Sequence, residues 1–420
     1  MINAATARKY LRRSLEVWHR PQHQPDVPYL LVVKLDRLLC GGENGLSAAQ
    51  YARHTGNVMR PSTPVALSPH VDFLRQYQLL GNHIFEPAVF KKTDYFNYAL
   101  ECIAATGAYL GCTSEDEIRS LAKRFAALYR SALPPDDPAS KKHFRPPGSI
   151  VYVRRIKFSD CFEVVDGMNQ LAIAYVTGRQ QYKVYVMPPE VVTPIQQLIL
   201  DHAFCRGSSR ELYQPVEAPE LGPEWILIRK CADRFKLMED FLISNQLMPP
   251  ACQSYLDIAF SYGWFVREFG KLGFDAHGGG EIDWAACEIA KRVYGLREDQ
   301  LTRGEVVHFL KSNTKQYDVV ACLSLLHHFL LGAPYRASIS AEEMIELVDR
   351  ATGGILFFDM GQEHEAWFHD KLKGWNPDFI EEWLRANTSF QSIQRLGTDH
   401  DNVPPFEHNY GRTLFACLKH

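Results

Sequence analysis

The sequence predicts a mixed α/β protein. Its C-terminal part is expected to form a Rossmann-like, mostly parallel seven-stranded sheet, preceded by a helical region and a small α+β module. From Leu247 onward, apolar segments of strand length alternate with helical patterns, which is typical of a parallel sheet covered by helices on both faces. Tyr255–Phe265 reads as an apolar strand with an acidic residue near its end, a tight turn and the start of a helix, and a second carboxylate, Glu281, follows the next strand. A chain of 420 residues is too long for one ordinary core, so two or three domains are expected.

The bulk composition is that of a soluble globular protein, with 46% hydrophobic residues, 23% charged residues and a net charge of −3. This balance argues against a broad basic face, so no nucleic-acid partner is expected. Met1–Leu15 is basic but holds no apolar core segment, so it does not read as a secretory signal, and no run of about 18 apolar residues predicts a membrane span. The ten cysteines are scattered without a Cys-x-x-Cys pair, which favours buried thiols in a reducing cytoplasm over disulfides or a metal site.

Four consecutive parts are expected along the chain. They are a mostly helical accessory region (1–140), an α+β module (148–205), a helical connector (206–248) and the sheet domain (249–420). Apolar spacing predicts helices over Phe85–Tyr98, Leu100–Tyr109 and Thr113–Tyr129. The five prolines of Pro134–Pro147 predict a linker, and residues 190–245 read as helical apart from a proline-rich interruption at 215–223.

The α+β module has its own pattern. Its predicted elements are strands at Ile150–Ile156, Cys161–Val165 and Tyr182–Met187 and a helix at Asn169–Thr177. A strand that ends in Asp166-Gly167 and runs into a helix resembles the ParB/sulfiredoxin-like fold, whose members hold phosphate with polar and basic residues at the helix start. Here Met168, Asn169 and Gln170 occupy those positions and offer no cation. A degenerate acceptor-recognition or scaffold module is therefore favoured. A nucleotide-dependent role centred on Asp166 with Arg154 and Arg155 remains the alternative.

The strands of the C-terminal domain follow one another in order. They are expected at Ser254–Ile258, Phe274–Gly280, Tyr317–Leu323 and Gly354–Asp359, followed by a closing hairpin of Phe390–Leu396 and Arg412–Cys417. The first strand is almost entirely apolar, as expected for a strand buried on both faces. An amphipathic helix is predicted over Ala285–Tyr294.

The turn after the first strand resembles the first motif of class I S-adenosylmethionine-dependent methyltransferases, in which an acidic residue is followed by glycines at alternate positions. Asp257 takes the acidic position, and Ala259, Ser261 and Gly263 take the glycine positions. Only the third is glycine, but small residues still leave room for a ligand near the backbone. The resemblance implies that this turn, with Tyr262, holds the methionine part of S-adenosylmethionine.

The second strand ends at a carboxylate that resembles the family's ribose ligand. By that resemblance Glu281 binds both ribose hydroxyls, next to Ile282, with Asp283 as the neighbouring option. The run Gly278–Gly280 is unusual within a strand, and we expect it to let the cofactor lie close.

The fourth strand and its continuation, Tyr317–Phe329, resemble the corresponding motif of sugar and small-molecule methyltransferases. Ser324 would contact the cofactor, and His327 or His328 would take the acceptor proton, since a histidine of near-neutral pKa suits that task. A packed or helix-capping role for one of these histidines is the alternative.

A second cluster follows the fifth strand. His364 is a further candidate base, and Glu363 and Trp367 are candidate acceptor contacts; a solvated helix start is the competing interpretation.

Together these patterns predict a cytoplasmic S-adenosylmethionine-dependent O-methyltransferase without a metal. The acceptor is expected to be a small molecule or a glycan, and the resemblance favours a sugar hydroxyl in polysaccharide, lipopolysaccharide or O-antigen assembly. Peripheral association with glycan-assembly enzymes is also expected. One alternative is a non-catalytic scaffold or binding protein with a degenerate methyltransferase fold. The other is a bifunctional enzyme whose ParB-like segment binds a nucleotide.

Overall fold

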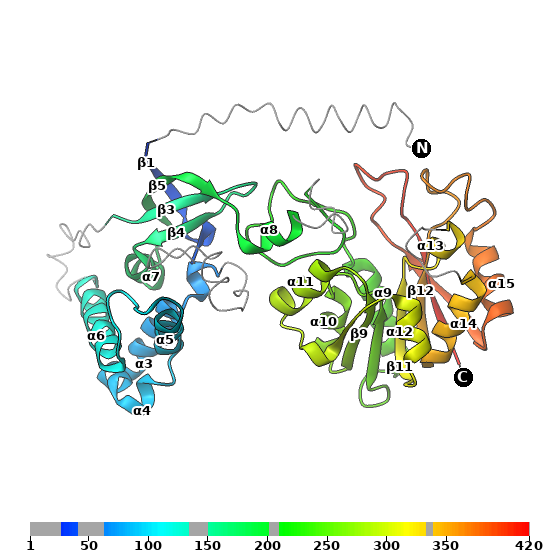
Figure 1. The fold of residues 1–420 in the computed structure, drawn as a ribbon, viewed down its shortest axis with the longest axis horizontal. Helices are drawn as coiled ribbons and strands as arrows, with labels where there is room; N and C mark the ends of the chain where they lie inside the picture. Colours follow the sequence, from blue (N-terminus) through cyan, green and yellow to red (C-terminus); the bar gives the residue numbers. More distant parts are fainter. Residues whose placement is uncertain (1–26, 41–62, 134–149, 201–209, 333–338, 420) are drawn as a thin grey trace. The chain divides into compact units, whose positions relative to one another are not determined.

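The structure is a computed structural model that describes residues 27–40, 63–133, 150–200, 210–332 and 339–419 (Figure 1). The expectations for Met1–Leu15 and for the linker at Pro134–Pro147 fall outside these residues. The chain divides into two compact units, which are described separately. The N-terminal unit comprises Pro21–Leu198 and Ala218–Trp225, and the C-terminal unit is built mainly from Ile226–His420, with Ile199–Glu217.

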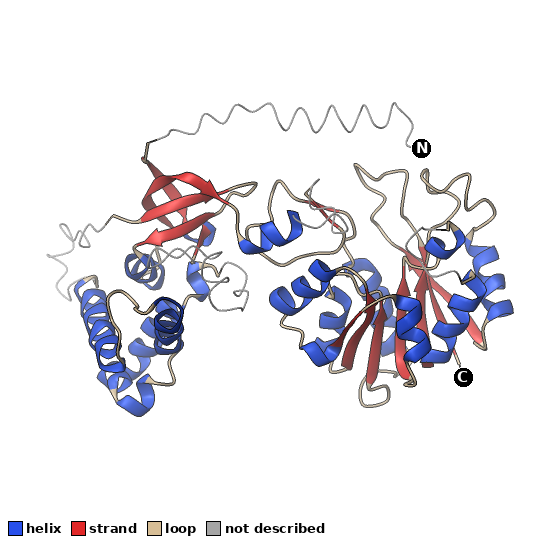
Figure 2. Ribbon diagram, viewed as in Figure 1, coloured by secondary structure: helices blue, strands red, loops and turns tan. Residues whose placement is uncertain are grey.

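A seven-stranded sheet forms the centre of the C-terminal unit (Figure 2). Its strands are β8 (Ser254–Ile258), β9 (Asp275–Glu281), β10 (Leu301–Arg303), β11 (Tyr317–Leu323), β12 (Thr352–Asp359), β13 (Ser392–Thr398) and β14 (Thr413–Leu418). Their spatial order is β10-β9-β8-β11-β12-β14-β13. The pairs among β8 to β12 are all parallel, and β14 runs antiparallel to both of its neighbours.

Helices cover both faces of this sheet. They are α9 (Ala232–Ser244), α10 (Trp264–Lys271), α11 (Trp284–Tyr294), α12 (Val306–Ser312), α13 (His327–Leu330), α14 (Ala341–Ala351) and α15 (Pro377–Asn387). Alternate strand residues enter two separate apolar clusters: Leu256 packs in the cluster with α12, α14 and α15, whereas its neighbour Tyr255 packs in the cluster with α9, α10 and α11. The predicted mixed α/β class with a large sheet is therefore confirmed, and burial on both faces explains the continuous apolar strands.

The N-terminal unit combines a five-stranded sheet with helices. The strands are β1 (Tyr29–Lys34), β2 (Leu38–Leu39), β3 (Tyr152–Ile156), β4 (Phe162–Asp166) and β5 (Gln181–Val191), in the order β1-β5-β3-β4-β2. The helices are α3 (Pro69–Leu80), α4 (Pro87–Phe90), α5 (Asp94–Thr106), α6 (Glu115–Ser131), α7 (Met168–Val176) and α8 (Pro194–Leu200). A single apolar cluster joins five strand valines (Val33, Val153, Val164, Val184 and Val186) to side chains of α3 to α7, so the helical region and the sheet share one core.

Two expectations for helices were wrong. The helix predicted over Phe85–Tyr98 is broken, because the Thr93 hydroxyl accepts the backbone N–H of Phe96 at 3.2 Å and starts α5 there. In residues 190–245, β5 runs on to Val191 beside β3, and a short parallel pair, β6 (Glu211–Leu212) and β7 (Ile226–Leu227), precedes α9. By contrast, the predicted capped start of α6 is present as a complete capping box at Ser114 and Glu117.

Candidate functional site

The turn that follows β8 has an unusual backbone. Ala259, Ser261 and Gly263 all have positive φ, at 55°, 52° and 76°. Two non-glycine residues therefore hold the left-handed conformation that the glycines of such turns adopt freely, at a cost of roughly 1–2 kcal/mol each. Gly263 has a second reason to be glycine, because a Cβ there would lie 2.9 Å from a Leu296 methyl carbon and 3.0 Å from the Ala290 Cβ. The third position thus lets α10 begin close to α11.

The expectation that Gly278–Gly280 lets a cofactor lie close was wrong. A Cβ on Gly278 would lie 2.5 Å from the ring of Phe260, and a Cβ on Gly279 would enter the ring of Phe309. At Gly280 the nearest atom would be the Val306 Cα, at 2.8 Å. The three glycines make room for side chains of the protein itself, and the fully buried Phe260 fills the space under the turn.

Glu281 joins the turn to the end of β9. Its Oε2 accepts the backbone N–H of Ser261 at 2.9 Å, and its Oε1 accepts the N–H of Asp283 at 2.8 Å. Each carboxylate oxygen has a second lone pair, so the group can accept further hydrogen bonds. Asp283 itself caps α11 by accepting the Ala285 N–H at 2.8 Å, which favours Glu281 over Asp283 as a ligand-binding carboxylate.

Apolar surface flanks this carboxylate. Ile282 is 40% exposed and Trp284 is 41% exposed, although both belong to large hydrophobic types that usually pack inside. Tyr262, in contrast, is buried in the turn. A carboxylate beside exposed apolar side chains fits a nucleoside, whose ribose donates hydrogen bonds and whose base is a flat apolar ring.

Asp257 lies at the carboxyl end of β8 and is only 3% exposed. Burial raises its pKa well above the usual value; the charge of Arg234 opposes this shift, and that of Glu281 adds to it. Among the described residues its Oδ2 has no hydrogen-bond partner. The carboxyl group is therefore buried, and its Oδ2 can still accept or donate a hydrogen bond.

Ser324 and the two histidines lie where β11 ends, beside the end of β8. The Ser324 backbone N–H and hydroxyl both donate to Asp359 Oδ1, at 2.7 and 3.0 Å. The buried His327 accepts the Gly361 N–H on Nδ1 at 3.1 Å, so its neutral ring carries the proton on Nε2. The half-buried ring of His328 lies 4.3 Å from the His327 ring.

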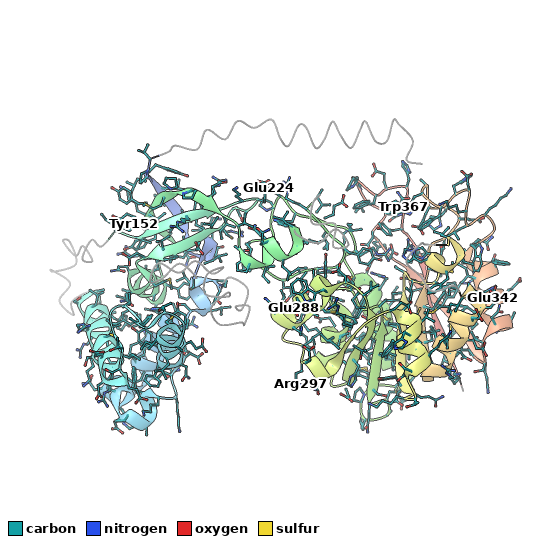
Figure 3. All side chains as sticks on the ribbon, in the orientation of Figure 1. Tyr152, Glu224, Glu288, Arg297, Glu342 and Trp367 are labelled. Carbon is teal, nitrogen blue, oxygen red and sulfur yellow. The ribbon has the colours of Figure 1, made fainter. Side chains whose placement is uncertain are left out.

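The segment after β12 holds the remaining predicted residues. The exposed His364 bonds through Nε2 to the Tyr410 carbonyl at 2.6 Å, which leaves Nδ1 as its basic nitrogen. Glu363 accepts the Gly374 N–H at 2.8 Å. Trp367 is 40% exposed (Figure 3), and its indole N–H donates to Glu365 at 2.9 Å. In this segment the ring of Phe368 packs against His327, with the two ring centroids 5.0 Å apart.

Sequence reasoning missed a buried network of charged residues at this edge of the sheet. Its members are Arg229, Arg234, Asp359, Glu365, Asp399, Asp401 and Arg412, all nearly or fully buried. Arg412 grips Glu365 with two hydrogen bonds of 2.8 and 2.9 Å and donates to the Ser324 hydroxyl at 2.9 Å. Although burial opposes ionisation of Glu365, the charge of Arg412 and its hydrogen bonds outweigh it and lower the pKa of that carboxyl group.

The second half of this network centres on Asp359. Arg234 donates to its carboxylate at 2.9 Å, and Arg229 reaches Asp399 at 2.9 Å and Asp401 at 3.0 Å. The network fixes the loops around the ends of β11 and β12 against the segment before α9. Its partners lie up to 172 residues apart in the chain (Arg229 to Asp401), so no local pattern could have revealed them.

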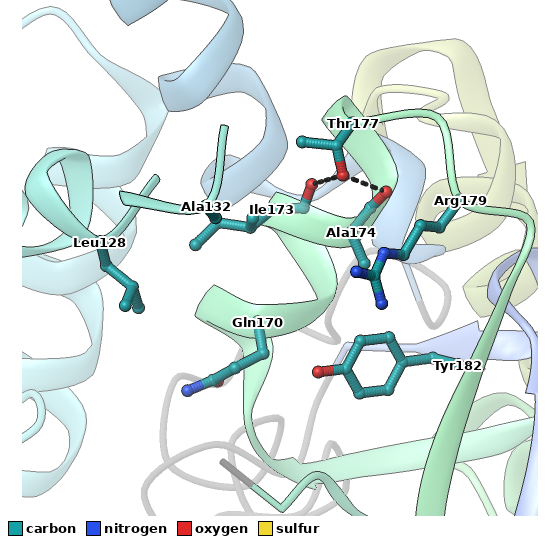
Figure 4. A pocket seen from close by; sticks show the side chains of 8 residues that line it. All are labelled: Leu128, Ala132, Gln170, Ile173, Ala174, Thr177, Arg179 and Tyr182. Atoms are coloured by element: carbon teal, nitrogen blue, oxygen red, sulfur yellow. Dashed lines mark hydrogen bonds between the residues drawn. The ribbon is translucent and has the colours of Figure 1, made fainter. Parts of the chain in front are cut away.

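The N-terminal unit contains a small cavity (Figure 4). Apolar side chains of α6 and α7 line it, together with Gln170, Arg179 and Tyr182. Its volume of about 30 Å³ holds only about one or two water molecules. It is therefore too small for a nucleoside-sized ligand. Within the described segments, no cluster of three or more metal-ligating side chains was found.

No protein-family model matches this chain, and no curated protein sequence matches it. Among solved structures it is similar to the bifunctional kinase-methyltransferase WbdD, at 14% identity and a TM-score of 0.42, over 54% of this chain and 46% of WbdD. It is also similar to magnesium protoporphyrin IX methyltransferase from Synechocystis PCC 6803, solved with bound SAH, at 17% identity and a TM-score of 0.31 over 45% of this chain and 84% of that enzyme. A third is a SAM-dependent methyltransferase from Archaeoglobus fulgidus, at 12% identity and a TM-score of 0.32 over 44% and 94% of the two chains.

The alignment with WbdD thus spans less than half of that protein's length. The solved structures named here are methyltransferases, in agreement with the resemblance read from the sequence.

Proposed function

We propose that the C-terminal unit is an S-adenosylmethionine-dependent O-methyltransferase with a sugar hydroxyl as acceptor. The observation that carries this proposal is the strand order β10-β9-β8-β11-β12-β14-β13 with β14 antiparallel between β12 and β13. An antiparallel hairpin closing a parallel sheet is the arrangement that the family resemblance implied. In such open sheets ligands bind beyond the carboxyl ends of the strands, which is where the candidate residues lie.

The residues at this edge fit the cofactor. Glu281, already oriented by two backbone N–H groups, would accept hydrogen bonds from the ribose hydroxyls. Ile282 would lie beside the base, since its exposed side chain adjoins that carboxylate. The turn from Asp257 to Gly263 would hold the methionine part, and the buried Asp257 carboxyl would meet its polar end.

Base catalysis is the chemical task left to the protein. When bound, the cofactor supplies an electrophilic methyl group on a sulfonium. A sugar hydroxyl is a weak nucleophile until a base takes its proton, and a half-buried histidine suits this task. His328 is the favoured base, whereas His327, whose Nδ1 accepts the Gly361 N–H and whose Nε2 carries the proton, would orient His328 or donate a hydrogen bond.

The segment after β12 would recognise the acceptor. Trp367 offers an exposed aromatic face held by the Glu365 carboxylate, and Glu363 adds a carboxylate in the same segment. Aromatic faces suit the apolar side of a sugar ring, and carboxylates accept hydrogen bonds from its hydroxyls. This supports a glycan acceptor of the kind used in polysaccharide or O-antigen assembly.

Transfer of a radiolabelled methyl group from S-adenosylmethionine to a panel of sugar glycosides tests the proposal. We expect the His328→Ala change to lower kcat by about 10²–10⁴-fold. The His308→Ala change, at an exposed histidine of α12 to which no role is assigned, is the matched control and should leave kcat within about twofold. Near wild-type transfer by a His327→Ala/His328→Ala double variant would refute the histidine role.

The second candidate function is a scaffold with a decayed cofactor site, and one observation favours it. Ala259 and Ser261 hold left-handed backbone positions at an energetic cost that a functioning turn usually avoids with glycine. Absence of any affinity for the cofactor or its demethylated product would support this candidate.

A further inference from the structure

The sheet of the N-terminal unit presents two different faces. Paired residues on neighbouring strands point to the same side of a sheet, so the strand register defines each face. The inner face carries Val33, Val153, Val164, Val184 and Val186, all of which belong to the buried core beneath α3 and α7. The opposite face is made by the alternate residues of β1, β5 and β3.

This second face, here called the outer face, is centred on two tyrosines. Tyr152 lies opposite Tyr185 across the β3–β5 pair, and their ring centroids are 6.0 Å apart at an angle of 39°. Tyr185 is in turn opposite Leu30 across the β5–β1 pair, and Val32 continues the row. Leu30 and Val32 are 44% and 59% exposed, and none of these four residues is in the core cluster of the unit. The outer face is therefore an aliphatic and aromatic strip, on which Leu30 and Val32 are exposed and the two tyrosines are half-buried.

Charge is divided across the strip. Lys183 pairs with Val32, and Lys34 ends β1; both are exposed. On the other side Arg154 lies opposite the buried Glu163, and the exposed Asp166 lies opposite Tyr152. Two exposed lysines therefore border the β1–β5 side of the strip, and the charge complement of that side is anionic.

We propose that the outer face binds an acidic glycan, a sugar polymer carrying carboxylates. Tyrosine rings present flat apolar faces to the C–H side of sugar rings, and their hydroxyls bond to sugar oxygens. Lys34 and Lys183 pair with carboxylates along the polymer. This inference rests on the proposed function, because it makes the N-terminal unit the holder of the chain whose hydroxyl the C-terminal unit methylates.

Charge density separates a glycan from a nucleic acid at this face. A single-stranded nucleic acid carries a phosphate on every nucleotide, and its binders line a continuous basic groove. The outer face offers two exposed lysines, one arginine opposite a carboxylate and the exposed carboxylate of Asp166, on a protein of net charge −3. A polymer of lower charge with non-planar rings fits better.

Affinity electrophoresis of the full chain through gels containing alginate, dextran or poly(U) tests the proposal. Alginate is a polyuronate, dextran is its neutral counterpart, and poly(U) represents single-stranded RNA. We expect alginate to retard the wild-type protein and a Lys34→Glu/Lys183→Glu variant to bind alginate about tenfold more weakly. A Tyr152→Ala/Tyr185→Ala variant should lose a comparable part of the affinity.

Lys92→Glu is the matched control, because Lys92 is an exposed lysine between α4 and α5 of the same unit, away from the outer face. It should bind alginate as the wild type does. All the lysines changed are exposed, so their replacement leaves the core intact. Unchanged binding by both double variants would overturn the proposal, as would stronger retardation by poly(U) or dextran than by alginate.

Calorimetric titration with S-adenosylhomocysteine tests cofactor binding independently of alginate binding, so the proposed function and the proposed glycan face can fail separately. Cofactor binding without retardation by alginate would contradict only the glycan face. Retardation by alginate without cofactor binding would leave the face in place and contradict the methyltransferase.

Discussion

Ala259 occupies a left-handed backbone position that costs an alanine roughly 1–2 kcal/mol and a glycine almost nothing. Replacing Ala259 with glycine removes that cost but adds about 0.4–1 kcal/mol of backbone entropy to the unfolded chain. The free energy of unfolding of Ala259→Gly should therefore equal or exceed that of the wild type by up to about 1 kcal/mol, as measured by urea denaturation.

Ala386→Gly is the control for this change. Ala386 is exposed within α15, where glycine should cost about 1 kcal/mol. Equal destabilisation by the two substitutions would show that the turn at Ala259 is not strained.

Asp257 predicts a second, pH-dependent effect. Burial raises the pKa of its carboxyl group well above 3.8. The folded state therefore binds more protons than the unfolded state above pH 3.8, and this group lowers stability as the pH rises through its folded pKa. An Asp257→Asn variant, which cannot ionise, should gain Tm relative to the wild type, and the gain should be larger at pH 8 than at pH 4. Differential scanning calorimetry at the two pH values measures this gain in Tm. An equal gain at pH 4 and pH 8 would contradict the raised pKa of the buried Asp257 carboxyl group.

At the residue scale, motifs with a local signature were predictable and long-range roles were not. Asp257 and Glu281 lie at the ends of strands, and the apolar pattern of the sequence locates those strand ends. The partners of Arg229 and Arg412 could not be predicted, because their carboxylates come from distant loops that only the folded chain brings together. The glycines of β9 were expected to leave room for a ligand. The sequence does not indicate that side chains of the protein itself fill that room.

Strand β9 carries the clearest prediction at the scale of an element. A Cβ at Gly279 would overlap the Phe309 ring of α12, so Gly279→Ala should destabilise the protein by about 1–3 kcal/mol through overpacking. Adding Phe309→Leu should recover part of that loss, since the smaller side chain leaves room. A double-mutant cycle by urea denaturation measures both effects.

Gly270→Ala is the matched control, because a Cβ there meets nothing within 4 Å and the residue lies inside α10. That change should stabilise the protein by about 1 kcal/mol. Additive effects of Gly279→Ala and Phe309→Leu would contradict the proposed contact.

Strand positions were easier to predict than helix ends. Ser254–Ile258 was expected as a strand and is one, because four of its five residues are buried and most of them are apolar. The break before α5 was missed, since Phe85, Val89 and Phe96 keep helical spacing across the break, and the bond from the Phe96 N–H to the Thr93 hydroxyl marks the new helix. The strand order of the sheet depends on crossovers that no single segment encodes.

At the scale of the whole molecule, the two units should respond differently to acid. His70 is fully packed in the N-terminal unit, with Nε2 3.0 Å from the Tyr109 hydroxyl, and burial lowers its pKa to about 3. The unfolded chain takes up that proton near pH 6.5, so this residue lowers stability as the pH falls below 6.5. Between pH 6.5 and pH 4.5 the loss is about 2 kcal/mol.

Hydrogen exchange of α3 amides at the two pH values measures this loss in the N-terminal unit alone. A His70→Gln variant keeps a polar partner for Tyr109 but cannot take up a proton, so its stability should fall less on acidification. An equal fall in the variant and the wild type would exclude His70 as the source.

The central claim is that the edge formed by the ends of β8, β9 and β11 binds S-adenosylmethionine, and calorimetric titration with S-adenosylhomocysteine tests it most directly. Glu281→Ala removes the carboxylate assigned to the ribose, and Glu382→Ala removes an exposed carboxylate of α15 as its control. We predict micromolar binding by the wild type and by Glu382→Ala and no measurable binding by Glu281→Ala. Absence of binding by the wild-type protein, or equal binding by Glu281→Ala, would contradict the account.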